Sequence, residues 1–361
     1  MKTRKSIVIL FGGISSEHEV SCVSAASVLE HIDREKYDVR TIGITKEGNW
    51  FLTGSPAAGI SDGSWEHDEN NRKAFIVPDR STGGIMAKNA DGTFEVIRTD
   101  AVFPVLHGRN GEDGTMQGLL QLAGIPFVGS DTAASSASMD KAITKAMIEH
   151  RGYVDQARCY VVHQTAYDRN KNAQLEAVNS FFADTYPLFV KPANAGSSVG
   201  ISKVKRAEDL ERALELAFAE DCKVLVEEAI TGREIEVAVL GNEDPQASCI
   251  GEIFAANEFY DYNAKYENSK SQTAIVKDLE PEKEQEIKDK AISVYETMGC
   301  SGMSRVDFFL EDGGRVVFNE INTLPGFTSI SMYPKLWEVS GIPYDELIDR
   351  LIKLALDKYE R

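Results

Sequence analysis

The hydrophobic pattern of the N-terminal third alternates between strand-like and helix-like segments. Residues 7–11 form a β-branched run that ends at two glycines, and apolar residues then recur at helical spacing through Val20, Val23 and Leu29. This pattern predicts a strand, a glycine turn and a helix. Further strands are predicted at 37–44 and 101–106, and a helix at 116–123 that Gly124 caps. Alternating strands and helices favour an α/β unit with a parallel, doubly wound sheet.

Two further units are predicted downstream of this α/β unit. A polar stretch at 54–92 has no clear period and is interpreted as a peripheral insertion or a long loop. The second unit begins near Asp131 with one helix that reaches Gly152, followed by a strand at 188–191, a glycine-rich loop and a helix at 207–219. The third contains β-rich runs, a helix at 282–298, a hairpin at 303–322 and a terminal amphipathic helix. The predicted units are residues 1–131, 132–226 and 227–361.

Composition and charge restrict the partners. With 361 residues and 42% hydrophobic composition, the chain can form several cores with a cleft between them. Its net charge of -18 would repel nucleic acid and anionic membranes, so neither is expected as a partner. Small molecules are expected instead. A phosphorylated ligand would then require lysines, arginines and backbone amides gathered locally at its site.

Cysteine usage and the N-terminus indicate a cytoplasmic protein. The five cysteines are scattered and have no CxxC spacing, which favours buried free thiols over a disulfide framework or a zinc cluster. The apolar run at 7–11 is too short for an export signal, and no stretch is long and apolar enough to span a membrane. We expect the protein to remain in the reducing cytosol.

The clearest chemistry lies in the predicted hairpin. If Gly313 and Gly314 form a two-residue turn, antiparallel register pairs Asp307 with Glu320 and Arg305 with Asn322. All four side chains would then share one face. Two carboxylates and an amide oxygen without His or Cys indicate a magnesium site. The competing interpretation is a solvated hairpin with an ordinary cross-strand ion pair.

A glycine- and serine-rich loop follows the strand at 188–191 and suits a phosphate. Its small residues allow backbone amides to approach phosphate oxygens, with Ser197 and Ser198 as further donors. It is not a Walker A loop, because no Gly-Lys-Ser/Thr follows at the required spacing. Lys141 and Lys191 could supply positive charge, and the segment at 224–230 could hydrogen-bond an adenine while Glu234 accepts from a ribose. The competing interpretations are a plain turn, surface lysines and solvated acids.

Taken in order, these elements resemble the D-alanine–D-alanine ligases of the ATP-grasp superfamily over nearly the whole chain. The matching segments are 11–21 (FGGISSEHEVS), 106–114 (LHGRNGEDG), 138–141 (SMDK), 190–192 (VKP), 196–200 (GSSVG), 260–266 (YDYNAKY), 304–307 (SRVD) and 319–326 (NEINTLPG). The resemblance implies an N-terminal α/β domain followed by a two-part ATP-grasp α+β fold. It also implies the cofactors ATP and Mg2+, as two ions for which Mn2+ could substitute.

The resemblance implies roles for individual residues. Glu17 would pair with the ammonium group of the first D-alanine, with His107, Ser197 and Tyr266 around it. The nucleotide would be bound by Lys141, Lys191, Ser198, Glu227, Glu228, Ile230, Glu234 and Lys265, and the metal by Asp307, Glu320 and Asn322. Arg305 and the backbone amide of Gly326 would stabilise the oxyanion in the second step. As alternatives from the residues alone, Glu17 could serve only the helix dipole, and Tyr266 could belong to a packing cluster.

For the second substrate, the resemblance places Ser331 at the carboxylate and Met332 near the side chain. An apolar Met332 and the presence of Tyr266 favour D-alanine over D-serine or D-lactate, although a single hydroxyl is weakly discriminated by an apolar pocket. Glu228 departs from relatives that carry a lysine beside the adenine. The family further implies a homodimer that makes D-alanyl-D-alanine for peptidoglycan through a D-alanyl phosphate.

Two other functions are weaker. A dehydrogenase is disfavoured because the glycine turn after the first strand lacks the GxGxxG spacing. A nucleotide-binding protein without turnover would be expected to lack a metal ligand or the arginine, yet Arg305, Asp307 and Glu320 are all present.

Overall fold

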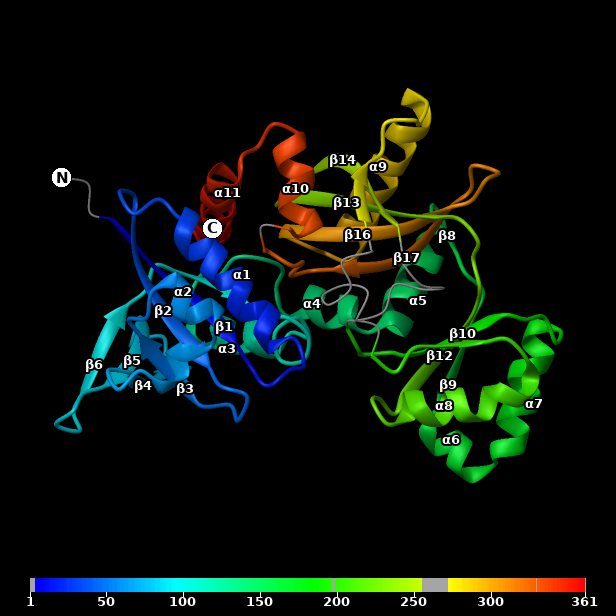
Figure 1. The fold of residues 1–361 in the computed structure, drawn as a ribbon, viewed down its shortest axis with the longest axis horizontal. Coiled ribbons are helices and arrows are strands. Elements are labelled where there is room, and N and C mark those ends of the chain that lie inside the picture. Colours follow the sequence, from blue (N-terminus) through cyan, green and yellow to red (C-terminus); the bar gives the residue numbers. More distant parts are fainter. Residues whose placement is uncertain (1–3, 197–198, 255–271, 329, 361) are drawn as a thin grey trace.

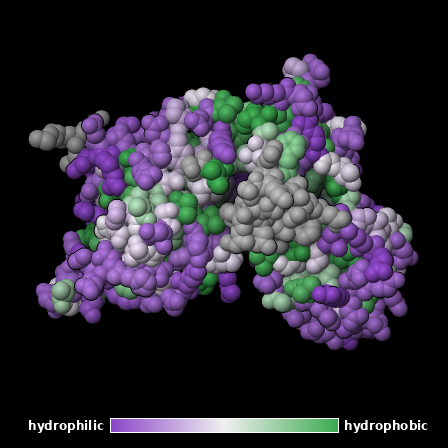
Figure 2. Space-filling model, in the orientation of Figure 1, coloured by the Kyte–Doolittle hydropathy of each residue, from purple (hydrophilic) through white to green (hydrophobic). Residues whose placement is uncertain are grey.

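The chain folds into three β-sheets with flanking helices, in three units arranged around a common centre (Figure 1). The computed structural model describes residues 4–196, 199–254, 272–328 and 330–360. The outer flanks are mostly hydrophilic in Figure 2, whereas hydrophobic side chains gather toward the middle of the molecule. Among the described residues, no helix has the length and apolar character needed to cross a membrane.

The N-terminal sheet has seven strands in the order β6-β5-β4-β3-β2-β1-β7. Its strands are β1 (Lys5–Gly12), β2 (Tyr37–Ile44), β3 (Trp50–Thr53), β4 (Arg72–Ile76), β5 (Gly84–Lys88), β6 (Phe94–Arg98) and β7 (Ala101–Val105). Strand β1 pairs in parallel with β2 and with β7; helix α1 (His18–His31) connects β1 to β2, and α3 (Thr115–Ala123) follows β7. The α/β prediction is confirmed, but the parallel sheet continues into four antiparallel strands.

Of the two interpretations of 54–92, the long loop was wrong. This segment contains α2 (Ala57–Ser61), η1 (Ser64–His67), β4 and β5. Trp65 is fully buried and its ring meets Phe11 edge-on at 4.9 Å between centroids. The period was hidden because Phe75 is exposed while its small neighbour Ala74 is buried, which inverts the usual hydrophobic alternation.

Burial of Trp65 makes Gly43 a sensitive position. A Cβ atom on Gly43 would lie 2.3 to 2.8 Å from three ring atoms of Trp65. We expect Gly43→Ala to lower the free energy of unfolding by about 1–3 kcal/mol through overpacking. Urea denaturation would measure this, with Gly54→Ala as the control because nothing lies within 4 Å of a Cβ there. Equal stability of the two variants would contradict the packing described here.

The second unit contains a four-stranded antiparallel sheet in the order β11-β10-β12-β9. The strands are β9 (Cys159–His163), β10 (Leu188–Pro192), β11 (Ser202–Val204) and β12 (Lys223–Glu228). The covering helices are α6 (Gln164–Arg169), α7 (Lys171–Phe182) and α8 (Leu210–Phe218), with η2 (Ala207–Asp209) leading into α8. Leu188, Val190 and Val226 face the apolar stripe of α8 in one core.

The third unit contains a six-stranded sheet in the order β15-β14-β13-β16-β17-β8. Its strands are β13 (Arg233–Gly241), β14 (Gln246–Phe254), β15 (Gln272–Ile275), β16 (Gly302–Leu310), β17 (Val316–Asn322) and β8 (Asp155–Gln156). Helices α9 (Pro281–Thr297), α10 (Met332–Val339) and α11 (Tyr344–Tyr359) accompany it. In Figure 1, α10 and α11 lie between this sheet and the N-terminal unit.

The single helix predicted from Asp131 to Gly152 is two helices, α4 (Thr132–Met139) and α5 (Lys141–Arg151). They separate at Asp140, whose side chain accepts hydrogen bonds from the amides of Ala142 and Ile143, 3.1 Å each, and so starts a new helix. Both helices pack into the core of the third unit, which contains Ala134 and Ile148. The predicted boundaries after residues 131 and 226 stay predictions.

Candidate functional site

A cleft of about 1150 Å³, partly open to solvent, lies where the three units meet. Its walls come from the turn after β1, the loop after β10, the start of α5, and strands β13, β16 and β17. The site residues predicted from the sequence that line it are Glu17, His107, Lys141, Lys191, Glu234, Arg305, Asp307, Glu320, Asn322 and Gly326. Residues far apart in the sequence therefore converge on one cavity.

At the cleft, the β16–β17 hairpin has the predicted register, but a β-bulge produces it and not the predicted two-residue turn. Asp307 pairs with Glu320 and Arg305 with Asn322. The turn is not a two-residue glycine turn: residues 311–315 connect the strands, and Leu310 pairs with Val316. A β-bulge beyond Phe308 inserts one extra residue, Asn319, and restores the register. Without the bulge, Glu320 would point to the opposite face of the sheet.

Arg305 is buried among acids at the floor of the cleft. Its Nε and Nη2 donate to the two oxygens of Asp307 at 2.8 and 2.7 Å, and its Nε lies 3.0 Å from Glu236 Oε1. Burial by itself lowers the pKa of the guanidinium, but Asp307 and Glu236 raise it well above its ordinary value. Arg305 therefore keeps its charge, and its fork holds Asp307 in a fixed orientation.

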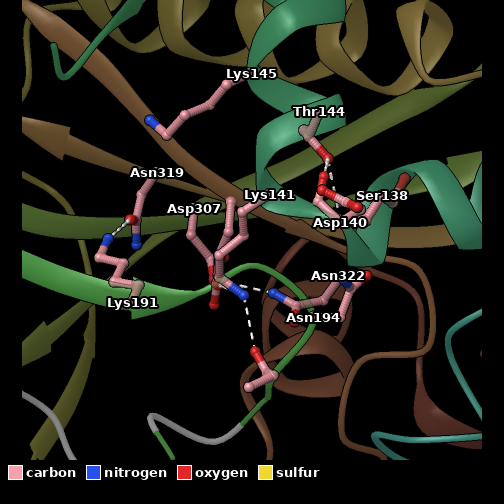
Figure 3. Close-up of polar contacts among 12 residues, drawn as sticks. Ser138, Asp140, Lys141, Thr144, Lys145, Lys191, Asn194, Asp307, Asn319 and Asn322 are labelled. Atoms are coloured by element: carbon pink, nitrogen blue, oxygen red, sulfur yellow. Dashed lines mark hydrogen bonds and ion pairs between the residues drawn. The ribbon is translucent and has the colours of Figure 1, made fainter. Parts of the chain in front are cut away.

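Two of the residues proposed to bind magnesium, Asp307 and Asn322, lie close together in this region (Figure 3). The Asn322 amide nitrogen donates to Asp307 Oδ2 at 3.2 Å, and the Lys141 ammonium lies 3.5 Å from Glu320 Oε2. Among the described residues, no group of three or more His, Cys, Asp or Glu side chains is placed to hold a metal. The set formed by two carboxylates and one amide fits a hard cation only if ligand oxygens complete its shell.

A second cavity adjoins the cleft and shares Lys191, Glu234 and Asn319 with it. Pro187, Ile230 and Phe309 form an apolar part of its wall, and Glu227 and Glu228 also line it. Apolar walls beside polar strand edges suit a planar base, and the shared residues mark the passage to the polar cleft. The two cavities together have the form expected for a nucleotide with its phosphates toward the hairpin.

Where the two cavities join, charged side chains lie close together and shift one another's pKa values. The Lys191 ammonium lies 2.7 Å from Glu227 Oε2 and 3.3 Å from the Asn319 side-chain oxygen that accepts its hydrogen bond. Burial by itself raises the pKa of Glu227, but Lys145 and Lys191 lower it to about 2. The opposite holds for Glu234: burial, with Asp307 and Glu320 nearby, raises its pKa to about 7.

The opposite wall of the cleft is formed by Glu17 and His107. A Cβ on Gly108 would lie 2.6 Å from Glu17 Oε2, and one on Gly196 would lie 3.1 Å from it, so the carboxylate sits close to the backbone of two chain segments. The positive φ of Gly108 favours glycine at the first of them. The Glu17 side chain does not cap helix α1. His107 Nδ1 donates to the Leu324 carbonyl at 3.2 Å, which joins this wall to the loop after β17.

Comparison with known proteins agrees with this architecture. Models of the D-ala D-ala ligase N-terminus and C-terminus match residues 6–130 and 150–353. A D-alanine–D-alanine ligase from Caldicellulosiruptor bescii is 50% identical over 99% of this chain and 96% of its own length, and one from Clostridium acetobutylicum is 49% identical over 98% and 99%. The chain belongs to the D-Ala D-Ala ligase family.

Solved structures of this ligase family share the whole fold. The VanG D-Ala:D-Ser ligase from Enterococcus faecalis is 38% identical, with a TM-score of 0.88 over 98% of this chain and 100% of the other. The D-alanine–D-alanine ligase from Coxiella burnetii is 35% identical, with a TM-score of 0.85 over 99% and 95%. The two C-terminal units therefore form the ATP-grasp fold of these ligases.

Ser331 and Met332, the residues predicted to bind the second substrate of the ligase, are not among the residues that line the cleft, whereas the predicted oxyanion donor Gly326 is. Gly326 lines it, and a Cβ there would lie 3.0 Å from Ser331 Oγ. The Ser331 hydroxyl accepts a hydrogen bond from the Thr328 amide at 3.0 Å. Met332 is not among the residues that line the cleft: its side chain is buried in the core and packs on Gly251 of β14.

Four predicted ligase site residues cannot be placed. Ser197, Ser198, Lys265 and Tyr266 lie outside the described residues. Conversely, three side chains at the cavities were missed, namely Lys145, Glu236 and Asn319. The spacing in the sequence could have indicated two of them. Lys145 is one helical turn after Lys141, and Glu236 is two strand residues after Glu234, so each lies on the same face as a predicted site residue. Asn319 reaches the site through the bulge, which no sequence pattern marked.

Proposed function

We propose that this protein joins two D-alanines in an ATP-dependent reaction, through a D-alanyl phosphate, and that the dipeptide serves peptidoglycan precursor synthesis. The observation that carries the proposal is the convergence of Arg305, Asp307 and Glu320 with Lys141 and Lys191 in one cleft. Full-length relatives named D-alanine–D-alanine ligase at 45–50% identity support the substrate.

The first step requires positive charge around the terminal phosphates. The carboxylate of the first D-alanine attacks the γ-phosphorus, ADP leaves, and an acyl phosphate forms. Glu17 would bind the ammonium group of this D-alanine, while Lys141 and Lys191 draw negative charge from the transferred phosphoryl group. Asp307, Glu320 and Asn322 would hold the magnesium ions, two in number or replaced by Mn2+, which supply further charge neutralisation when bound.

The second step requires an oxyanion site. The amine of the second D-alanine attacks the acyl carbon, a tetrahedral oxyanion forms, and phosphate leaves as the peptide bond is completed. Arg305 and Gly326 both line the cleft. The Arg305 guanidinium and the Gly326 backbone amide would both donate hydrogen bonds to the developing oxyanion. Ser331 would bind the carboxylate of this second amino acid.

D-Serine is the second candidate for the acceptor, because the solved D-Ala:D-Ser ligase from Enterococcus faecalis has a TM-score of 0.88 to this chain. We favour D-alanine because the curated relatives at higher identity are named for it. We further propose a cytoplasmic homodimer. All five cysteines are free, which agrees with a reducing compartment.

The decisive experiment measures phosphate release and product together. We expect release from ATP only when both magnesium and D-alanine are present, and not with L-alanine. Mass spectrometry with D-alanine, D-serine and D-lactate in competition should give mainly D-alanyl-D-alanine. Phosphate release that does not depend on the amino acid would reject the ligase, and a dominant D-alanyl-D-serine product would reject only the acceptor.

A further inference from the structure

Helix α5 directs two lysines to two different parts of the site. Lys141 and Lys145 are four residues apart and so lie on the same face of the helix. Lys141 faces Glu320 in the cleft, whereas Lys145 lines the second cavity. In Figure 3 the Lys145 amine points to the side where Lys191 and Asn319 lie, away from the group around Lys141 and Asp307.

Lys145 and Lys191 hold one buried carboxylate between them. The Lys145 ammonium lies 2.8 Å from Glu227 Oε1, and the Lys191 ammonium lies 2.7 Å from Glu227 Oε2. The Glu227 side chain is only 5% exposed, Lys145 9% and Lys191 13%. With two cations on one anion, the cluster carries a surplus positive charge that water screens poorly.

The second lysine at Glu227 affects how Lys191 can bind a phosphate group. Lys191 lines both cavities, so a phosphate group bound in the cleft would compete with Glu227 for its ammonium. A buried carboxylate that loses its single cation is strongly unfavourable. Lys145 remains at the other oxygen of Glu227, so the carboxylate keeps a partner while Lys191 turns to the phosphates.

We propose that Lys145 is a positioning residue of the nucleotide site, which acts through Glu227 to release Lys191 for the phosphates of ATP. This inference rests on the proposed function only in taking ATP as the ligand of the two cavities. Lys145 also fixes the Glu227 carboxylate at the apolar cavity, where that carboxylate can accept a hydrogen bond from the amino group of a base. The predicted signature is a defect in nucleotide binding rather than in the chemical step.

The test is Lys145→Met, measured by steady-state kinetics of the whole enzyme. We expect the KM for ATP to rise roughly tenfold to a hundredfold, because Lys191 then stays on Glu227. The kcat at saturating ATP and the KM for D-alanine should change less than about threefold. Lys145→Arg keeps the charge and should restore most of the ATP affinity. Lys353→Met, at an exposed position of α11, controls for the chemical change itself.

A double variant separates positioning from simple structural support. In a Glu227→Gln background no carboxylate needs a partner, so Lys145→Met should alter the KM for ATP less than about twofold. This pair removes the Lys145 cation together with the Glu227 anion and leaves Lys191 its hydrogen bond to Asn319, so no buried carboxylate lacks a partner and the pair remains testable if Lys145→Met alone does not fold. Equal losses in both backgrounds, or an unchanged KM for ATP in Lys145→Met, would overturn the inference. A wild-type enzyme that does not use ATP would instead overturn the proposed function.

Discussion

Replacing Arg305 by lysine is expected to lower kcat by about a hundredfold or more, which is the usual cost of losing a preorganised oxyanion donor. The guanidinium places two donors on Asp307 at 2.8 and 2.7 Å and a third contact on Glu236 at 3.0 Å. A lysine ammonium keeps the charge but cannot span both acids with the same fork. The KM for ATP should change little, because the role proposed for Arg305 is in the second step.

The matched control for this prediction lies on the same hairpin. Arg315 stands at the turn, 42% exposed, and contacts Glu311 at 3.5 Å. Arg315→Lys should leave kcat within about twofold of wild type, because an exposed ion pair contributes little. Initial rates of phosphate release, together with thermal melts of both variants, would measure this. An Arg305→Lys enzyme as active as Arg315→Lys would remove Arg305 from the chemistry.

Replacing Glu320 by glutamine is expected to reduce turnover by at least about a hundredfold, since even residues that only support metal ligands cost 10- to 100-fold when changed. Glutamine has nearly the same shape, so the hairpin should remain folded. The loss should be accompanied by a higher magnesium concentration for half-maximal activity, because one of the two acidic ligands becomes neutral.

Magnesium titrations of phosphate release would measure both effects. Glu311→Gln provides the control, because Glu311 is on the same hairpin but contacts Arg315 at the turn instead of the cleft. Unchanged turnover and magnesium dependence in Glu320→Gln would show that this carboxylate does not bind the metal. Circular dichroism of both variants would exclude loss of fold as the cause.

Much of the site was predictable because strands and helices repeat regularly. The alternation along β16 places Arg305 and Asp307 on one face, and the alternation along β17 places Glu320 and Asn322 on one face. The bulge decides that the two faces coincide. The four-residue spacing on α5 likewise brings Lys141 and Lys145 to one side. Local periodicity thus specified which side chains could act together.

From the sequence alone, the family and the grouping of Arg305 with Asp307 on one strand face could be predicted, together with ten of the residues that line the cleft. The sequence did not determine the bulge at Asn319, the break at Asp140 that starts α5 with Lys141, or the burial of Met332 against Gly251. Met332 packs on a strand that is distant in the chain, the bulge depends on how β17 pairs with β16, and the break depends on whether Asp140 caps a new helix. Pairing and packing of this kind override local propensity, so these features could be established only from the folded structure.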